Sequence, residues 1–343
     1  GQAGTLSLAA AGTLVNLGTL ETSGAVHGAV VSAGRSVTLS ADILHNAGAV
    51  NTSGGSLAST NGAVGGNVTI TATNALTNLG AITTSGGSGN AGGAGGTVTI
   101  TLNGGHRVGP VGRLVNTGAI TTTGGTCDAN ATVAGAGGSV TITAINGRVR
   151  HSSAIATSGG GSALPATTCT GGAAGSLSIV ASATDAGWDD DSMVDVGGNI
   201  TLTGGAAGSG GGAGGSLRIT ARRVRGGLSR MFGYGTLSLV GGDGGGFGGN
   251  GGAAGAVTHV TVTGTGLGVF PVYIPEQIHI HPQVTATGGA AAGLGSGGAG
   301  GVISLLNVTS GQSQITGASD EPGLLLAGGA NITPGGGFGA GAA

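Results

Sequence analysis

The sequence predicts an all-β chain folded as a parallel β-helix, or β-solenoid, of about nine coils with Gly-rich connectors stacked along one edge. Three observations support this class. A short strand motif returns along the whole chain, a second strand motif follows each copy of the first, and a glycine-rich connector of variable length completes each unit. Constant strands with insertions confined to one connector are typical of a solenoid, in which each repeat contacts only its neighbours.

The first strand motif alternates apolar and polar residues, usually after a glycine. Its copies include GTLSL at 4–8, GNVTI at 66–70, GTVTI at 96–100 and GSLSI at 175–179. A period of two with many β-branched residues indicates strands with one buried face. Stacking such strands about 4.8 Å apart aligns their inward side chains. The predicted ladder consists of Leu6, Val37, Val68, Val98, Val140, Leu177 and Leu217.

The second strand motif has the same alternation and follows an Asn-x-Gly turn in several copies. Examples are NAGAVNTSGG at 46–55, NLGAITTSGG at 78–87 and NTGAITTTGG at 116–125. Its predicted inward ladder is Leu20, Val50, Ile82, Ile120, Ile155, Ile200, Leu237, Val284 and Leu324. At roughly 1.5–3 kcal/mol for each buried aliphatic side chain, the ladders form a sufficient core without aromatic residues.

The connectors have a three-residue beat, as in AGGAGG at 91–96 and GGAGG at 211–215 and 297–301. An extended three-fold helix of the polyproline II type would place Ala on one side and Gly on the other two. Successive connectors could then stack through backbone hydrogen bonds. Unordered loops are the alternative, and the sequence favours neither.

Composition excludes several classes of protein. The chain has 84 Gly among 343 residues, 6% charged residues, 38% hydrophobic residues and a net charge of −2. It is too apolar for a typical disordered chain and lacks the Gly-X-Y period of collagen. A net charge of −2 does not provide the basic surface that binds nucleic acid. No apolar run reaches the 18 residues of a membrane span. The clustered acids and bases that β-helical lyases need in a groove are missing too. We therefore expect a structural protein and no enzyme.

The repeats leave no internal boundary, so residues 1–343 are predicted to form a single β-solenoid domain. Residues 264–283, which contain Phe270, Pro271 and Tyr273, are the least repetitive segment. We expect this segment to be an insertion that projects from the rod.

The segment TLVNLGTLETSGAVHGAVVSAGRSVTLSADILHNAGAVNTSG at 13–54 resembles repeat regions of filamentous-haemagglutinin-type adhesins and autotransporter passengers. The same repeat pattern extends through most of the chain. The resemblance implies a parallel β-helix exported to a bacterial surface. The connectors are more glycine-rich than in those families, at a density similar to mycobacterial glycine-rich repeat proteins. The resemblance carries over no catalytic or binding residue.

The two cysteines, Cys127 and Cys169, occupy the same connector in consecutive coils. Stacking brings equivalent positions to about 5 Å, within the Cα separation of a disulfide. A disulfide implies an oxidising compartment. We therefore predict an extracellular or cell-surface protein, secreted with its signal peptide removed.

Two clusters are weak candidates for metal binding. The acidic run Asp189, Asp190 and Asp191 could hold Ca²⁺, and His279 and His281 lie on one side of a predicted strand. A solvated loop and outward polar strand positions are the simpler interpretations. No cofactor is therefore predicted.

An open solenoid exposes unpaired strand edges at both ends, and such edges template pairing with another chain. The C-terminal GGGFGAGAA followed by the N-terminal GQAGTLSL reads like the internal stretch 245–260. We therefore expect a filament subunit that assembles head to tail with itself, with lateral bundling as an option and without nucleic acid or membrane insertion. The predicted polymer interface is Gly1, Gln2, Ala3, Gly4, Thr5, Leu6, Gly337, Phe338, Gly339 and Ala340.

Two alternatives remain for the function. The chain could be a fragment of a large secreted β-helical adhesin. Ice binding through an outward hydroxyl ladder, with Thr83, Thr121 and Thr201 among its members, is less favoured because Thr is a common outward residue in any strand.

Overall fold

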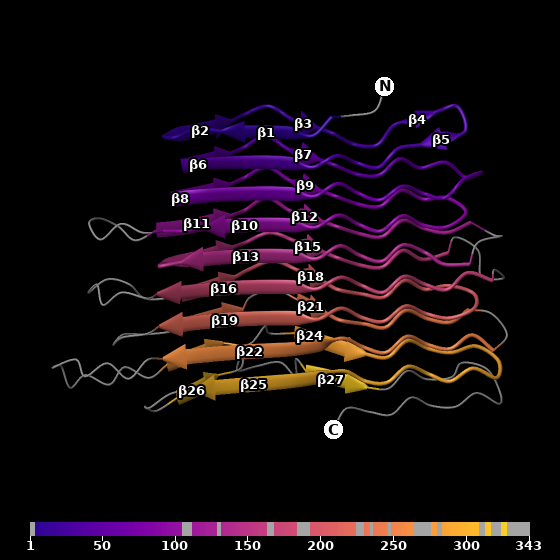
Figure 1. Ribbon diagram of the computed structural model, residues 1–343. Coiled ribbons are helices and arrows are strands. Elements are labelled where there is room, and N and C mark those ends of the chain that lie inside the picture. The colour runs from indigo at the N-terminus through magenta and orange to yellow at the C-terminus, as the bar shows by residue number, and fades with distance from the viewer. Residues whose placement is uncertain are drawn as a thin grey trace.

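The structure is a computed structural model that describes residues 4–104, 112–128, 132–162, 168–183, 193–223, 230–233, 236–245, 248–263, 276–279, 283–308, 313–316 and 324–327. In these residues the chain is all-β and contains no helix, as the sequence predicts. Figure 1 shows the strands in layers that follow one another from the N-terminal to the C-terminal end. Strands of successive layers pair in parallel, and the described antiparallel pair is the short hairpin β4 (Val26–His27) and β5 (Val30–Val31) in the first connector.

Each sequence repeat contributes strands to three parallel series. The first series comprises β1 (Leu6–Ala9), β6 (Val37–Asn46), β8 (Val68–Asn78), β10 (Val98–Leu102), β13 (Val140–Ile145), β16 (Leu177–Ala183), β19 (Leu217–Arg223), β22 (Ala256–Thr263) and β25 (Val302–Val308). The second comprises β2 (Thr13–Asn16), the later halves of β6 and β8, β11 (Gly112–Asn116), β14 (Gly147–His151), β17 (Met193–Val196), β20 (Arg230–Gly233), β23 (Glu276–His279) and β26 (Ser313–Thr316). The third comprises β3 (Leu20–Glu21), β7 (Val50–Asn51), β9 (Ile82–Thr83), β12 (Ile120–Thr121), β15 (Ile155–Ala156), β18 (Ile200–Thr201), β21 (Thr236–Ser238), β24 (Gln283–Thr287) and β27 (Leu324–Ala327).

The first two series form one 16-stranded sheet, and the third forms a 9-stranded sheet. The long strands β6 and β8 run through both series, and the register of their pairing shifts between Ala41 and Ile43, where the first series passes into the second. Both predicted ladders are confirmed by the register of these sheets. Val68 pairs with Val37 and Val98, and Ile120 pairs with Ile82 and Ile155.

The two strand motifs recognised in the sequence correspond to the first and third series. The second series was not predicted from the sequence. Its members are short, and they carry an inward residue followed two positions later by an inward polar residue, as in Leu14 and Asn16 or Leu44 and Asn46. Four residues of alternation are too few to separate a strand from a turn, especially beside a glycine. The paired copies supply the missing information, since Leu14 aligns with Leu44 and Leu44 with Leu76.

The core lies between the two sheets and follows the whole stack. Its buried members are almost all Val, Leu, Ile and Ala, and Leu39, Ile70, Ile100 and Ile142 are 0% exposed. Identical or similar side chains recur at each level because strand pairing places equivalent residues above one another. The aliphatic repeats therefore become columns of mutual contact, without a need for aromatic residues.

The connectors are ordered and stacked, so the alternative of unordered loops is wrong for the described connectors. Figure 1 shows them as wavy traces running side by side along one edge. In one connector Gly92 and Gly95 donate hydrogen bonds to carbonyls of the next repeat, at 3.1 and 2.9 Å. Gly93 and Gly96 donate instead to the opposite arm of their own connector, at 2.8 and 2.6 Å. Donors of each kind recur every three residues, in agreement with the three-residue beat of the sequence.

A single chain of hydrogen bonds links the two connector arms through successive repeats. Gly93 donates to Gly87, Gly125 to Gly93, Gly135 to Gly125 and Gly160 to Gly135, each at 2.8–2.9 Å. Equivalent arms of successive repeats also stack so closely that a Cβ on any of these glycines would lie within 2.0 Å of a backbone oxygen of the preceding repeat. Glycine is thus required at two of every three positions by contact between backbones.

Part of the predicted insertion at 264–283 belongs to the sheets. Glu276–His279 form β23, which pairs with β20 and β26, and Gln283 begins β24. Residues 264–275 and 280–282 lie outside the described residues.

Candidate functional site

The first repeat presents an open end of the strand stack. Among the described residues, strands β1, β2 and β3 have a partner on one side only, whereas β6 is paired on both sides. The inward side chains of this repeat, Leu6, Leu8, Leu14 and Leu20, pack against the core and remain partly exposed. Their register partners one layer further on are 0–1% exposed. The open end therefore combines apolar surface with unpaired strand edges.

A buried ladder of amides runs inward from this end. The Nδ2 atom of Asn16 donates to Oδ1 of Asn46 at 2.6 Å, Asn46 donates to Asn78 at 2.6 Å, and Asn78 donates to Asn116 at 2.5 Å. Each of the last three also donates to the backbone oxygen two residues later, at 3.0 Å. The Oδ1 atom of Asn16 receives no donor from the described residues, so the ladder has a free acceptor at the open end.

His151 takes the fifth place of the amide ladder. Asn116 Nδ2 lies 2.7 Å from His151 Nδ1, and His151 Nε2 lies 2.7 Å from the carbonyl oxygen of Ser153. Since Asn116 donates, Nδ1 accepts and Nε2 carries the proton. The imidazole therefore reproduces the acceptor and donor of an asparagine at this position, and burial lowers its pKa to about 4.

A second polar ladder accompanies the first. Thr52, Thr84 and Thr122 are fully buried, and their hydroxyls donate to carbonyl oxygens of the returning connector arm at 2.7–2.8 Å. Both ladders give way to apolar residues after the fifth repeat, where Val196 follows His151 and Leu202 follows Thr157. The fifth repeat is thus the junction between a core with polar ladders and an aliphatic one.

Only part of the predicted polymer interface lies in the described residues. Leu6 belongs to β1 at the open end, and Gly4 and Thr5 precede it as exposed residues. Gly1, Gln2, Ala3, Gly337, Phe338, Gly339 and Ala340 lie outside the described residues. The residues that sequence reasoning missed are Leu14, Asn16 and Gly18, because their role depends on the second strand series and on the turn that follows it.

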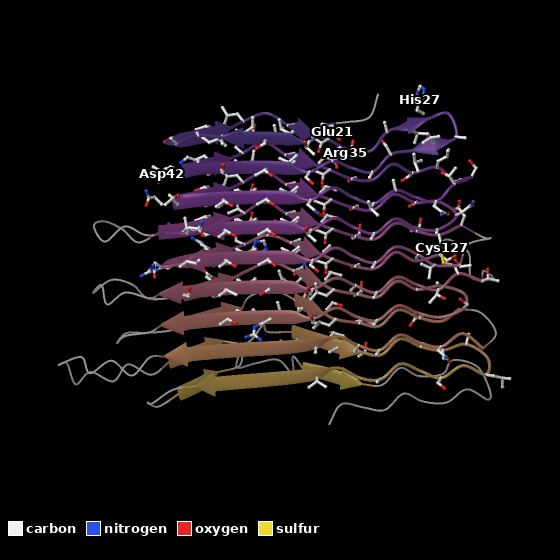
Figure 2. All side chains as sticks on the ribbon, in the orientation of Figure 1. Glu21, His27, Arg35, Asp42 and Cys127 are labelled. Carbon is white, nitrogen blue, oxygen red and sulfur yellow. A yellow bond between two sulfur atoms is a disulfide. The ribbon has the colours of Figure 1, made fainter. Side chains whose placement is uncertain are left out.

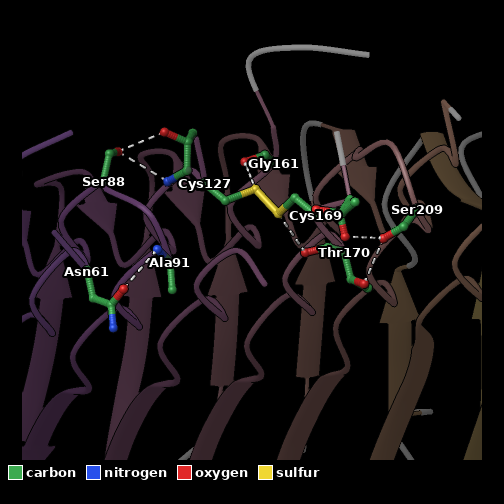
Figure 3. The surroundings of a disulfide bond; sticks show 10 residues. Asn61, Ser88, Ala91, Cys127, Gly161, Cys169, Thr170 and Ser209 are labelled. Atoms are coloured by element: carbon green, nitrogen blue, oxygen red, sulfur yellow. Dashed lines mark hydrogen bonds between the residues drawn. A yellow bond between two sulfur atoms is a disulfide. The ribbon is translucent and has the colours of Figure 1, made fainter. Parts of the chain in front are cut away.

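The two cysteines are joined across consecutive connectors, as predicted. Cys127 and Cys169 form a disulfide with a Cα–Cα distance of 6.6 Å and a sequence separation of 42 (Figure 3). Both side chains are 0% exposed and share a small buried cluster with Ala134 and Ala207. The connectors thus enclose a second, minor core near the edge of the stack, and the disulfide lies inside it.

Removal of the disulfide is expected to lower the free energy of unfolding by up to about 4 kcal/mol, the chain-entropy value for a loop of this length. Chemical denaturation with and without reductant measures the difference. The double variant Cys127→Ser, Cys169→Ser is the control, since reductant should not change its stability. Alkylation of two thiols in the native protein without reductant would contradict the assignment.

The predicted metal ligands are not brought together within the described part of the chain. Asp189, Asp190, Asp191 and His281 lie outside it, and only the backbone of His279 is described, in β23. Among the described residues no group of three or more His, Cys, Asp or Glu side chains could hold a metal ion.

Comparisons with known proteins assign neither a family nor a function to the chain. No protein-family model, no curated protein and no solved structure matches the chain. Within the described residues there is no helix long and apolar enough to cross a membrane. The disulfide is compatible with an extracellular protein.

Proposed function

We propose that the chain is a non-enzymatic structural subunit of an extracellular filament or surface fibre, in which copies add end to end at the open end of the strand stack. The observation that carries the proposal is the uncovered first repeat, where Leu6, Leu8, Leu14 and Leu20 occupy core positions yet remain partly exposed. A further repeat placed on them would bury this apolar surface and pair the edges of β1, β2 and β3. It would also supply a donor to Asn16 Oδ1.

The proposal includes a finer description of the fold. Each repeat passes from the first strand series to the second, then to the third, and returns through a connector to the first. We infer that this path closes into a parallel β-solenoid. Solenoids lend themselves to end-on growth, because the added interface is the same contact that already joins neighbouring repeats. A heterologous contact of this kind continues into an open fibre.

Gly18 provides a sharp test of end-on addition. In later repeats a Cβ on the equivalent glycine would lie 1.9–2.0 Å from a carbonyl oxygen of the preceding turn: Gly48 meets Gly18, Gly80 meets Gly48, and Gly118 meets Gly80. A Cβ on Gly18 itself has nothing within 4 Å. The variant Gly18→Ala should therefore fold normally and lose the ability to receive a preceding repeat.

We expect electron microscopy to show fibres of the unmodified protein and short rods of Gly18→Ala, with equal thermal midpoints for the two subunits. Leu17→Ala is the matched control, since Leu17 is the neighbouring residue, is 77% exposed and points away from the stack. Fibres of unchanged length for Gly18→Ala would refute end-on addition through this end.

The alternative function is that of a segment of a large secreted β-helical adhesin, in which the preceding repeat belongs to the same chain. The mass of the native protein separates the two functions. A covalent chain of far greater mass favours the adhesin, and a non-covalent polymer of one subunit favours the filament.

A further inference from the structure

One side of the stack forms a broad surface of small, uncharged side chains, which we call the hydroxyl face. It consists of the outward side chains of residues 33–40, 64–71, 94–101, 136–143 and 173–180, that is, five layers of returning connector arm and following strand. Every layer has Ala or Val at its first outward position, followed by Ser, Thr or Asn and then by Ser or Thr. Arg35 lies within the first range and is partly exposed, and the next exposed charge in the same columns is Arg218, one layer beyond the face.

The hydroxyl face is regular in two directions. Along the stack Thr38, Thr69, Thr99, Thr141 and Ser178 are register partners, so their column repeats about every 4.8 Å. Across the stack, outward strand residues alternate, which separates neighbouring columns by about 7 Å. Figure 1 shows the strands of this sheet running nearly parallel from the first layer to the last, and Figure 2 shows short side chains with oxygen atoms along them. The face is therefore a regular lattice.

A regular lattice is matched most simply by a second copy of itself. Two copies share the same period by construction, so the Thr methyl groups of one copy can seat between the columns of the other over the full length. Identical stacked side chains form tightly interdigitated interfaces in this way. Four of the five layers carry no charged residue and the first carries only Arg35, so repulsion between like faces is small, and the net charge of −2 offers little opposition.

The size of the face is adequate for a specific contact. Five layers and an extended length of eight residues correspond to about 500 Å² on each copy, or about 1,000 Å² in total, which is the lower limit for a specific interface. In a filament the contact would recur in every subunit, and the linked contacts would reinforce one another.

We propose that the hydroxyl face packs against the same face of a second copy and so joins molecules side by side. The lateral contact follows from one subunit alone. Its bundling consequence rests on the proposed filament, and the two ideas are separable because end-on addition determines fibre length whereas the lateral contact determines fibre width.

The test places two lysines at the centre of the hydroxyl face in adjacent layers, Thr99→Lys with Thr141→Lys. The matched control is Thr83→Lys with Thr121→Lys, adjacent layers of the 9-stranded sheet with the same side chain and similar partial exposure. We expect the first double variant to give fibres of single width in electron microscopy, and the control to keep the multiple width of the unmodified protein. Raising the salt to about 1 M should restore much of the lateral association, because the Debye length falls to about 3 Å.

Sedimentation of short rods provides a reading that is independent of fibre growth. The unmodified protein and the control should associate side by side in proportion to concentration, and the Thr99→Lys, Thr141→Lys variant should stay monomeric with an unchanged thermal midpoint. Equal widths and equal association for all three proteins would overturn the proposal. So would loss of lateral association in the control alone, or its absence in the unmodified protein.

Discussion

Replacing Gly125 by alanine is expected to lower the free energy of unfolding by at least about 3 kcal/mol, a value in the upper range for single substitutions. A Cβ at this position would lie 1.9 Å from the carbonyl oxygen of Gly87 in the preceding connector. The obstacle is backbone that is itself tied to neighbours on both sides, so it cannot yield as a flexible side chain would. Separating the arms would also break the bonds of the Gly125 amide to Gly93, at 2.8 Å, and of the Gly135 amide to Gly125, at 2.9 Å.

Urea denaturation followed by circular dichroism measures this effect. The matched control is Ala136→Ser in the same pair of arms, because Ala136 occupies the exposed third position of the connector beat. Surface substitutions of this kind usually change stability by less than about 0.5 kcal/mol. If Gly125→Ala changed stability no more than Ala136→Ser, the close contact between connector arms would be wrong.

Lowering the pH from 7.5 to 4 is expected to destabilise the protein by about 3 kcal/mol through His151 alone. Burial is the main reason that the pKa of His151 falls from 6.5 to about 4, while hydrogen bonds to Ser153 and Asn116 oppose the shift. In the unfolded chain the imidazole takes up a proton near pH 6.5, and in the folded chain it stays neutral until about pH 4. Unfolding therefore binds a proton between these values, so stability is fully present above pH 6.5 and is lost as the pH falls towards 4. A difference of about 2.5 units corresponds to about 3 kcal/mol.

The variant His151→Asn isolates this contribution. Asparagine supplies the same acceptor to Asn116 and the same donor to Ser153, as Asn46, Asn78 and Asn116 do in the preceding layers. The ladder should thus persist while the proton is no longer taken up. Asp195 is present in both proteins, and it acts in the opposite sense at the acid end of the range because burial raises its pKa, with Arg150 partly opposing the shift. Subtracting the two pH profiles removes that contribution.

We expect the steep loss of unfolding free energy between pH 6.5 and 4 to be absent from His151→Asn, so that the difference between the two profiles shows the contribution of His151. Equal slopes for the two proteins would show that His151 is protonated in the folded state or exposed to solvent. Either result would contradict the conclusion that His151 is buried and neutral because it takes the fifth place of the amide ladder.

The aliphatic ladders of two strand series, the number of repeats and the cysteine pair could be predicted from the sequence because each follows from the alignment of recurring repeats. Val68 and Val98 belong to nearly identical motifs, and once such motifs are stacked their partners follow from alignment alone. Cys127 and Cys169 also lie in consecutive connectors, as alignment of the repeats indicates, although Cys127 is in register with Ser162 and Cys169 lies on the other arm, beside the paired residues Val133 and Thr170. Because equivalent residues of successive repeats pair with one another, aligning the repeats within a single sequence is enough to predict contacts between residues far apart in the chain.

Other features were decided only by the tertiary structure. The second strand series, the amide ladder from Asn16 to His151 and the buried hydroxyls of Thr52 and Thr84 arise where short segments of different repeats come together. An isolated Asn-x-Gly segment is an ordinary turn, and its amide becomes a buried ladder member only when a neighbour supplies the acceptor. The connectors illustrate the same principle, since a three-residue glycine beat permits both a loop and a stack. Backbone hydrogen bonds between repeats favour the stack over the loop, and these bonds form only in the folded structure, where the connector arms lie side by side.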